Sequence, residues 1–277
     1  MSNLREKALI VNLSISEWNG RKFDRKVTQE VDDAHGTHKS GAFSKNLIDL
    51  SELNPIIKVR GELRSTHNTL TLPWGDNGDR LLPAKGYFKY IEKIKELERE
   101  FNDEVSRFLS NYENLKAAAR RNLKTLFVDS DYPTEQQIKQ RFGVTITYLP
   151  VPDSYDFRVD IASSTDVDEL RKSIASEISD RHKAATGDLV ERCKGMVKRI
   201  IDTLDQGNDK TFRNTMITNL EELLEIIPSM NYTEDPAIDK MVKTLDNIVV
   251  DPDHLRNDVD FRQDYLNKVK KINDLLF

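Results

Sequence analysis

The chain has 277 residues, of which 38% are hydrophobic and 32% charged, and its formal net charge is −5. The apolar fraction is below the globular norm and the charged fraction above it, so the composition favours long exposed helices over a thick core. Apolar residues remain frequent and periodic, which argues against disorder. No apolar run approaches the length of a membrane span, so we expect no membrane partner.

The charge is unevenly divided along the chain. Residues 1–127 carry 22 Lys and Arg against 18 Asp and Glu, whereas residues 128–277 carry 20 against 29. A dedicated nucleic-acid-binding protein usually has a stronger basic bias. One basic cluster near the start consists of Arg21, Lys22, Arg25 and Lys26. Because acidic residues are interleaved there, the pattern favours an ordinary solvated surface.

The start of the chain and its cysteine content indicate a compartment. The first residues lack the apolar region and small-residue cleavage site of a signal peptide. The single cysteine, Cys193, cannot form an internal disulfide and falls on an apolar helical stripe. We therefore expect a packed thiol in a reducing cytoplasm.

Residues 1–84 are predicted to form a β-containing region. Alternating apolar residues over 8–16 predict a strand, and Asn19-Gly20 predicts a tight turn into a second strand over 21–31. A loop is expected over 32–46 and a short helix over 44–53. Residues 69–83 are then expected to form a short extended hairpin around a glycine-rich turn.

The next region, 85–207, is predicted to contain two long helices around a small head. Apolar residues recur every three or four positions over 87–126 and again over 167–204, with a mean spacing close to the coiled-coil value in the first run. We expect an antiparallel hairpin, and parallel pairing between separate chains is the alternative. The head, 128–164, should hold a short helix over 135–142, capped by Thr134 and Gln137, and strands over 144–149 and 157–161; Thr165 and Asp166 are expected to cap the second long helix.

Residues 208–277 are predicted to form a helical bundle. Prolines punctuate three apolar-periodic runs, which lie at 210–227, 235–249 and 254–276. Asp235 and Asp251 are natural caps beside two of these prolines. The predicted fold class is therefore mainly α (α+β), with a long coiled-coil hairpin between a β-containing N-terminal region and this bundle.

The motifs of common enzymes are absent from the sequence, and we expect no cofactor and no metal. His35 and His38 are three residues apart in a glycine-rich loop, but zinc needs further ligands. The stretch from Asp76 to Asp79 resembles a fragment of a calcium loop without its terminal glutamate, so a turn explains it better. An enzyme site around Asp76, Asp79, Arg80 and these two histidines stays open as a third hypothesis, which substitution of Asp79 and Arg80 would test.

The end of the first long helix is basic and lies near aromatic residues. Its cations are Lys116, Arg120, Arg121 and Lys124. Tyr112, Phe127 and Tyr132 could stack nucleic-acid bases beside them. Stabilisation of the negative helix C-terminus explains the same cations without any ligand.

Five stretches resemble a family of uncharacterised proteins of tailed bacteriophages and conjugative elements. They are WNGRKFDRKV, TLPWGDNGDRLLPA, AAARRNLKTLF, DYPTEQQIKQRF and PVPDSYDFRV, and the resemblance covers roughly residues 5–165. Its members often occur near genes for a MoxR-like AAA ATPase and a von Willebrand factor A-type protein. The resemblance transfers no catalytic residue. Trp74, Arg80 and Arg158 belong to its motifs, and the two arginines are the better functional candidates because an arginine beside turns and apolar strands usually has a specific partner.

Two functions follow as expectations. The first is a non-enzymatic accessory protein that forms a homo-oligomer or docks a protein partner, such as the AAA ATPase, through its coiled-coil arm. The alternative is a DNA-binding protein of phage replication or recombination that uses the basic residues.

Overall fold

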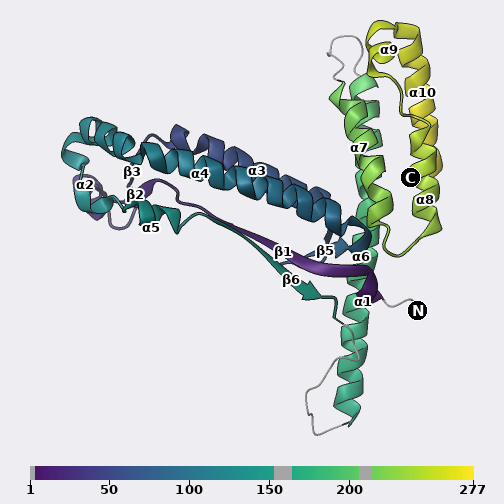
Figure 1. Ribbon diagram of the computed structural model, residues 1–277, viewed down its shortest axis with the longest axis horizontal. Coiled ribbons are helices and arrows are strands. Elements are labelled where there is room, and N and C mark those ends of the chain that lie inside the picture. The colour runs from purple at the N-terminus through teal and green to yellow at the C-terminus, as the bar shows by residue number, and fades with distance from the viewer. Residues whose placement is uncertain (1–3, 153–163, 206–213) are drawn as a thin grey trace. The chain divides into compact units, whose positions relative to one another are not determined.

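The computed structural model describes residues 4–152, 164–205 and 214–277, and it confirms a mainly α fold with a small antiparallel sheet (Figure 1). The helices are α1 Leu4–Lys7, α2 Arg25–His35, α3 Asn54–Thr69, α4 Tyr87–Leu123, α5 Glu135–Lys139, α6 Ser164–Asp205, α7 Thr215–Met230, α8 Pro236–Asp246, α9 Pro252–Asn257 and α10 Val259–Leu276. The strands are β1 Ala8–Ser16, β2 Arg21–Phe23, β3 Ser44–Asn46, β4 Leu72–Pro73, β5 Arg80–Pro83 and β6 Gly143–Pro150.

The chain divides into two compact units, each assembled from segments distant in sequence. The first unit comprises Met1–Asn12, His67–Ile91 and Thr147–Phe277, and the second comprises Leu13–Thr66 and Glu92–Ile146. The predicted regions 1–84, 85–207 and 208–277 describe successive stretches of chain, and as domain boundaries they stay a prediction.

The larger sheet has the strand order β4-β5-β1-β6. In the first unit β5 pairs antiparallel with β1, from Ala8 opposite Pro83 to Val11 opposite Arg80. The hairpin expected over 69–83 is confirmed, because β4 pairs antiparallel with β5 across a turn. Leu81, Leu82 and Pro83 are all buried, so both faces of β5 are covered.

The hairpin predicted after Gly20 is wrong in its pairing. Gly20 does have φ +67, as a tight turn requires, but β2 pairs antiparallel with β3 rather than with β1. The remainder of the expected second strand is helix α2 instead. Asp24 decides this outcome, because its side chain accepts hydrogen bonds from the backbone N–H groups of Lys26 and Val27 and so begins the helix.

Two other local expectations need correction. The short helix expected over 44–53 is instead strand β3 followed by one 3₁₀ turn at Leu50–Leu53. The short helix expected over 135–142 ends at Lys139, although its capping box of Thr134 and Gln137 is confirmed. The strand expected over 157–161 and the side chains of Thr165 and Asp166 lie outside the described residues.

The core of the second unit covers the apolar stripe of α4. Trp18 is buried with its ring centroid 5.9 Å from that of Phe108 and 6.0 Å from that of Tyr112. Phe142 lies 6.3 Å from both Phe101 and Phe108. The stripe that predicted a coiled coil is therefore occupied by side chains of the same chain.

In the first unit α6 packs chiefly against α10, α7 and β4. The expected partner of α6, the first long helix, lies mostly in the second unit. Cys193 is buried on the inner face of α6, as predicted, and burial raises the pKa of its thiol to about 12. The apolar stripe of α6 is thus buried against the C-terminal helices, because these helices have apolar faces of their own.

Two of the C-terminal helices begin at their predicted caps, whereas α7 continues to Met230 with Pro228 inside it, so this proline does not end the helix as expected. Asp235 caps α8 and Asp251 caps α9 by accepting backbone N–H groups. The helix expected over 254–276 is divided into α9 and α10, because Asp258 takes an extended conformation and caps α10 through the N–H of Phe261.

A buried lysine joins four segments of the second unit. The Lys45 ammonium lies 3.0 Å from Asp24 and 2.8 Å from Asp131, and it donates to the carbonyl oxygen of Leu126. Burial by itself would lower the pKa of Lys45, but hydrogen bonds to the two carboxylates raise it. The lysine is therefore charged, and it ties β3 to the start of α2 and to the segment after α4.

Replacing Lys45 tests this junction. Lys45→Met keeps the apolar stem but removes the cation from Asp24, Asp131 and the Leu126 carbonyl. We expect a loss of about 1–3 kcal/mol in the free energy of unfolding, measured by urea denaturation. Lys58→Met, at an exposed lysine of α3 in the same unit, is the control. Equal stability of the two variants would contradict the proposed role of the junction.

A second buried polar pair lies in the first unit. The Nδ1 atom of His67 is 2.9 Å from the hydroxyl of Tyr90, and the Nε2 atom has no hydrogen-bond partner among the described residues. Burial, assisted by the positive charge of Arg80, lowers the pKa of His67 from 6.5 to about 4. His67 is therefore neutral in the folded protein at neutral pH.

The lowered pKa of His67 predicts a loss of stability in mild acid. Between the two pKa values the unfolded chain binds the proton and the folded chain does not, so stability falls as pH decreases through that interval. The free energy of unfolding should fall by about 2 kcal/mol between about pH 7 and about pH 5 because of His67. Chemical denaturation of the protein and of His67→Gln at both pH values measures the difference. A variant with the same pH dependence as the original protein would rule out this contribution.

Candidate functional site

Trp74 is a packing residue of the first unit. Its side chain is buried, and its ring meets that of His182 edge-on at 5.0 Å between centroids. Its carbonyl oxygen accepts a hydrogen bond from Arg181. These contacts connect the turn after β4 with α6, and Trp74 also lines a pocket of about 380 Å³ with residues of α6.

Arg80 completes the C-terminal end of α3. Its guanidinium donates to the carbonyl oxygens of Asn68 and Thr71 and to the Thr71 hydroxyl. Arg192 of α6 donates to the carbonyls of Asn68, Thr69 and Thr71. The last carbonyls of a helix have no partner within it, so these two arginines supply the missing donors. The specific partner expected for Arg80 is thus the chain's own backbone.

The stretch Asp76–Asp79 is a turn. The carbonyl oxygen of Asp79 accepts hydrogen bonds from the N–H groups of Trp74 and Gly75, and its carboxylate accepts one from Asn12. The side chains of His35 and His38 are exposed and belong to the other unit. The residues of the third hypothesis therefore belong to two units, and that hypothesis stays a prediction.

Two of the predicted cations at the end of α4 are held by contacts within the second unit. Lys116 and Arg120 share the Asp129 carboxylate at 3.2 Å and 3.0 Å. Lys116 also lies over the ring of Tyr132, and Arg120 lies 4.8 Å from the ring centroid of Phe127. The hydrogen bond from Lys116 is the main cause of the lowered pKa of Asp129. These aromatic rings are therefore already engaged by cations of the chain.

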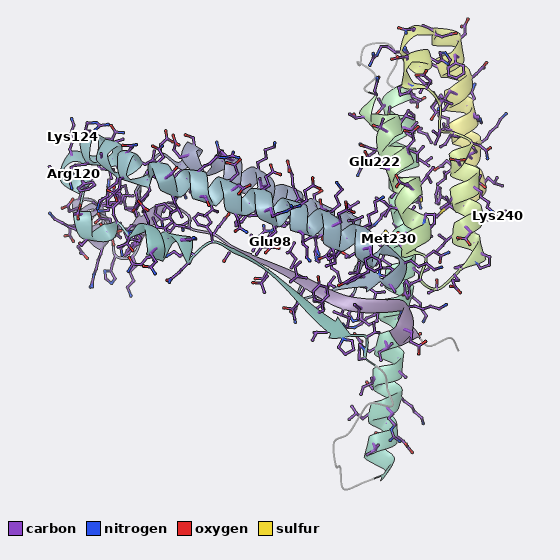
Figure 2. All side chains as sticks on the ribbon, viewed as in Figure 1. Glu98, Arg120, Lys124, Glu222, Met230 and Lys240 are labelled. Atoms are coloured by element: carbon purple, nitrogen blue, oxygen red, sulfur yellow. The ribbon has the colours of Figure 1, made fainter. Side chains whose placement is uncertain are left out.

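The other two predicted cations of α4 are free to meet a partner. Arg121 and Lys124 are exposed and form no ion pair with any residue that the structure describes. Figure 2 shows Lys124 beside Arg120 at the C-terminal end of α4. Arg158, the remaining predicted site residue, lies outside the described residues.

The Lys45 junction brings further cations to this end of α4. Lys45 binds the carbonyl of Leu126, and in the antiparallel ribbon its neighbour across the pair is Lys22 of β2. Lys22, Arg21 and Arg25 are exposed and have no ion-pair partner in the described part of the chain. The basic cluster at the start of the sequence and the C-terminal end of α4 thus lie at one end of the second unit, here called the basic end.

A polar pocket of about 440 Å³ lies in the basic end. It is lined by Trp18, Arg21, Lys22, Leu47, Ser130, Asp131, Tyr132, Pro133, Gln137, Gln140 and Arg141. Asp131 is the acidic residue of the lining, and it is paired with Lys45. Arg141 forms no ion pair with the described residues, so the pocket presents three unpaired cations.

The charge of the basic end differs from that of the whole protein. Residues 18–46 and 110–142, which build it, hold twelve Lys and Arg against eight Asp and Glu, although the complete chain has a net charge of −5. Such a concentration of positive charge raises the local affinity for anions. The sequence analysis missed Arg141 and the pocket because no local pattern connects Arg141 with Arg21.

A second hollow, here called the groove, lies in the first unit. It measures about 910 Å³ and is lined by residues of α6 and α8 and by the end of α10. Its apolar lining includes Val190, Ile238, Met241, Leu275 and Leu276. Leu275, at the edge of the groove, is 75% exposed. Lys240, shown on α8 in Figure 2, belongs to the polar part of the lining.

Within the described residues, no helix combines the length and apolar character that a membrane crossing needs. No curated protein and no solved structure matches the chain. The family described as "Protein of unknown function (DUF3150)" matches residues 5–251. This match spans most of the sequence, so the chain belongs to the DUF3150 family.

Proposed function

We propose that the protein is a non-enzymatic nucleic-acid-binding accessory protein of a tailed phage or conjugative element, acting in the bacterial cytoplasm. The observation that supports this function is the basic end, where unpaired cations from β2, α4 and the residue Arg141 lie at one end of the second unit. Arginine and lysine contacts to phosphates supply most of the affinity of sequence-independent nucleic-acid binding.

Exposed aromatic side chains favour a single strand as the ligand. Phe23 is 51% exposed and Phe43 is 37% exposed. Phe23 ends β2 and Phe43 directly precedes β3, and the N–H of Asp24 donates a hydrogen bond to the carbonyl oxygen of Phe43, so both rings belong to the same end of the paired strands. Aromatic rings beside a basic track stack unpaired bases without sequence preference. The proposed ligand is therefore single-stranded nucleic acid, bound through its backbone and its bases.

Docking of a protein partner, here the MoxR-like AAA ATPase, is the second candidate function. The groove supports it, because an apolar hollow with an exposed leucine at its edge is typical of a binding surface. The α4 stripe supports it less, since Trp18 and Phe142 cover that stripe. Homo-oligomer formation through the same stripe would have to displace these side chains, and light scattering would detect it.

The nucleic-acid proposal predicts a binding affinity that falls steeply with salt. Arg121→Ala combined with Lys124→Ala should weaken binding of a single-stranded oligonucleotide and reduce the slope of log K against log salt by about 1.4, or about 0.7 for each lost phosphate contact. Fluorescence anisotropy at several salt concentrations measures both quantities.

The matched control changes two exposed lysines of α6 in the other unit. Lys194→Ala combined with Lys198→Ala removes the same charge and should leave the slope unchanged. If both double variants reduced the slope equally, general electrostatics would explain binding and the basic end would have no special role. Absence of binding at low salt would remove the proposal itself.

Docking of a protein partner in the groove predicts that a substitution at the edge of the groove abolishes the complex. Leu275→Asp places a charge at the apolar edge and should abolish co-elution with a purified MoxR-like ATPase in size-exclusion chromatography, because a buried unpaired carboxylate is strongly unfavourable. Val259→Asp, on the same helix but outside the groove lining, is the control. Unchanged co-elution of Leu275→Asp would exclude the groove as the contact.

A further inference from the structure

We propose that the pocket of the basic end binds the terminal phosphate of a nucleic-acid strand. This inference rests on the proposed function and assigns one chemical group of the ligand to one place. The observation is the combination of a concave polar pocket with three unpaired cations, Arg21, Lys22 and Arg141.

The groups around the pocket are mainly hydrogen-bond donors. The two guanidinium groups and the ammonium group can only donate. Gln137 accepts the N–H of Thr134 through its side-chain oxygen, so its amide NH₂ group stays available as a donor. Phosphate oxygens are acceptors only, and a donor-rich lining therefore matches a phosphate better than a neutral sugar or base.

Tyr132 is a buried residue of the pocket lining. Its side chain is 93% buried, and its hydroxyl has no hydrogen-bond partner among the described residues. Most buried polar groups have such a partner, so the unpaired hydroxyl of a residue that lines the pocket favours a ligand that supplies one. Burial raises the pKa of Tyr132, so the phenol keeps its proton and acts as a donor.

Charge and shape both favour a terminal phosphate over an internal one. A phosphate monoester carries between about 1.5 and 2 negative charges at neutral pH, whereas each internal phosphodiester carries one. Three cations around one pocket suit the more highly charged group. A concave pocket of about 440 Å³ also admits the end of a strand more readily than its middle, and its volume lies within the range of about 300–1,000 Å³ typical for small ligands.

The closing experiment compares two oligonucleotides of identical sequence, one with a 5′-phosphate and one with a 5′-hydroxyl. We expect the protein to bind the phosphorylated strand about tenfold more tightly, since charge-assisted hydrogen bonds are made to the end group. Arg141→Ala should remove this preference. Tyr132→Phe, which keeps the ring and its packing, should reduce it by about two- to tenfold.

The control is Arg121→Ala, at an exposed cation of α4 outside the pocket lining. This substitution should weaken the binding of both oligonucleotides by the same factor, so that the ratio of their two affinities is preserved. Thermal melting verifies the folding of each variant, and Tyr132→Phe serves if Arg141→Ala does not fold.

The possible outcomes separate the two proposals. Equal affinity for both strands would overturn the terminal-phosphate assignment while the nucleic-acid proposal stands. A preference that survives Arg141→Ala and Tyr132→Phe would place the end group elsewhere and would also overturn the assignment. If neither strand binds at low salt, the proposed function fails together with the assignment.

Discussion

The second unit depends on the ammonium group of Lys45. Three oxygens from separate segments surround it: the carboxylates of Asp24 and Asp131 and the carbonyl of Leu126. Buried ion pairs often add little net stability compared with apolar substitutes, but removing one member leaves the others uncompensated. The main effect of Lys45 is therefore to position the segments that contact it. It fixes the β2–β3 ribbon against the end of α4, and the pocket and the basic end follow from that placement.

The fold was predictable from the sequence wherever periodicity and local caps act alone. The stripe over 87–126, the strand over 8–16 and the caps Thr134, Asp235 and Asp251 are such cases. Several of the failures concern partners. Gly20 signals a turn correctly, yet the strand that follows it pairs with β3, about twenty residues further on, because long-range packing decides which strands pair. The stripe of α4 could likewise not reveal that Trp18 and Phe142 would cover it.

The candidate site was less predictable, because an arginine has the same sequence signature in a structural and in a binding role. Arg80 lies beside a turn, and its guanidinium donates hydrogen bonds to the carbonyl groups at the end of α3. Arg141 also stands beside a turn, but it has no ion-pair partner in the described chain and lines the pocket. The difference lies in what surrounds each guanidinium, and those neighbours come from distant segments.

The cations of the basic end divide into two groups with different physical roles. Lys116 and Arg120 are neutralised by Asp129 and rest on aromatic rings, so they order the segment after α4 and contribute little field at longer range. Arg21, Lys22, Arg121 and Lys124 lack such partners and face solvent, where they attract anions at the cost of mutual repulsion. Keeping like charges together without carboxylate partners is unfavourable in the free protein. An anionic ligand would relieve that repulsion, which is the physical reason to place the binding function here rather than on the paired cations.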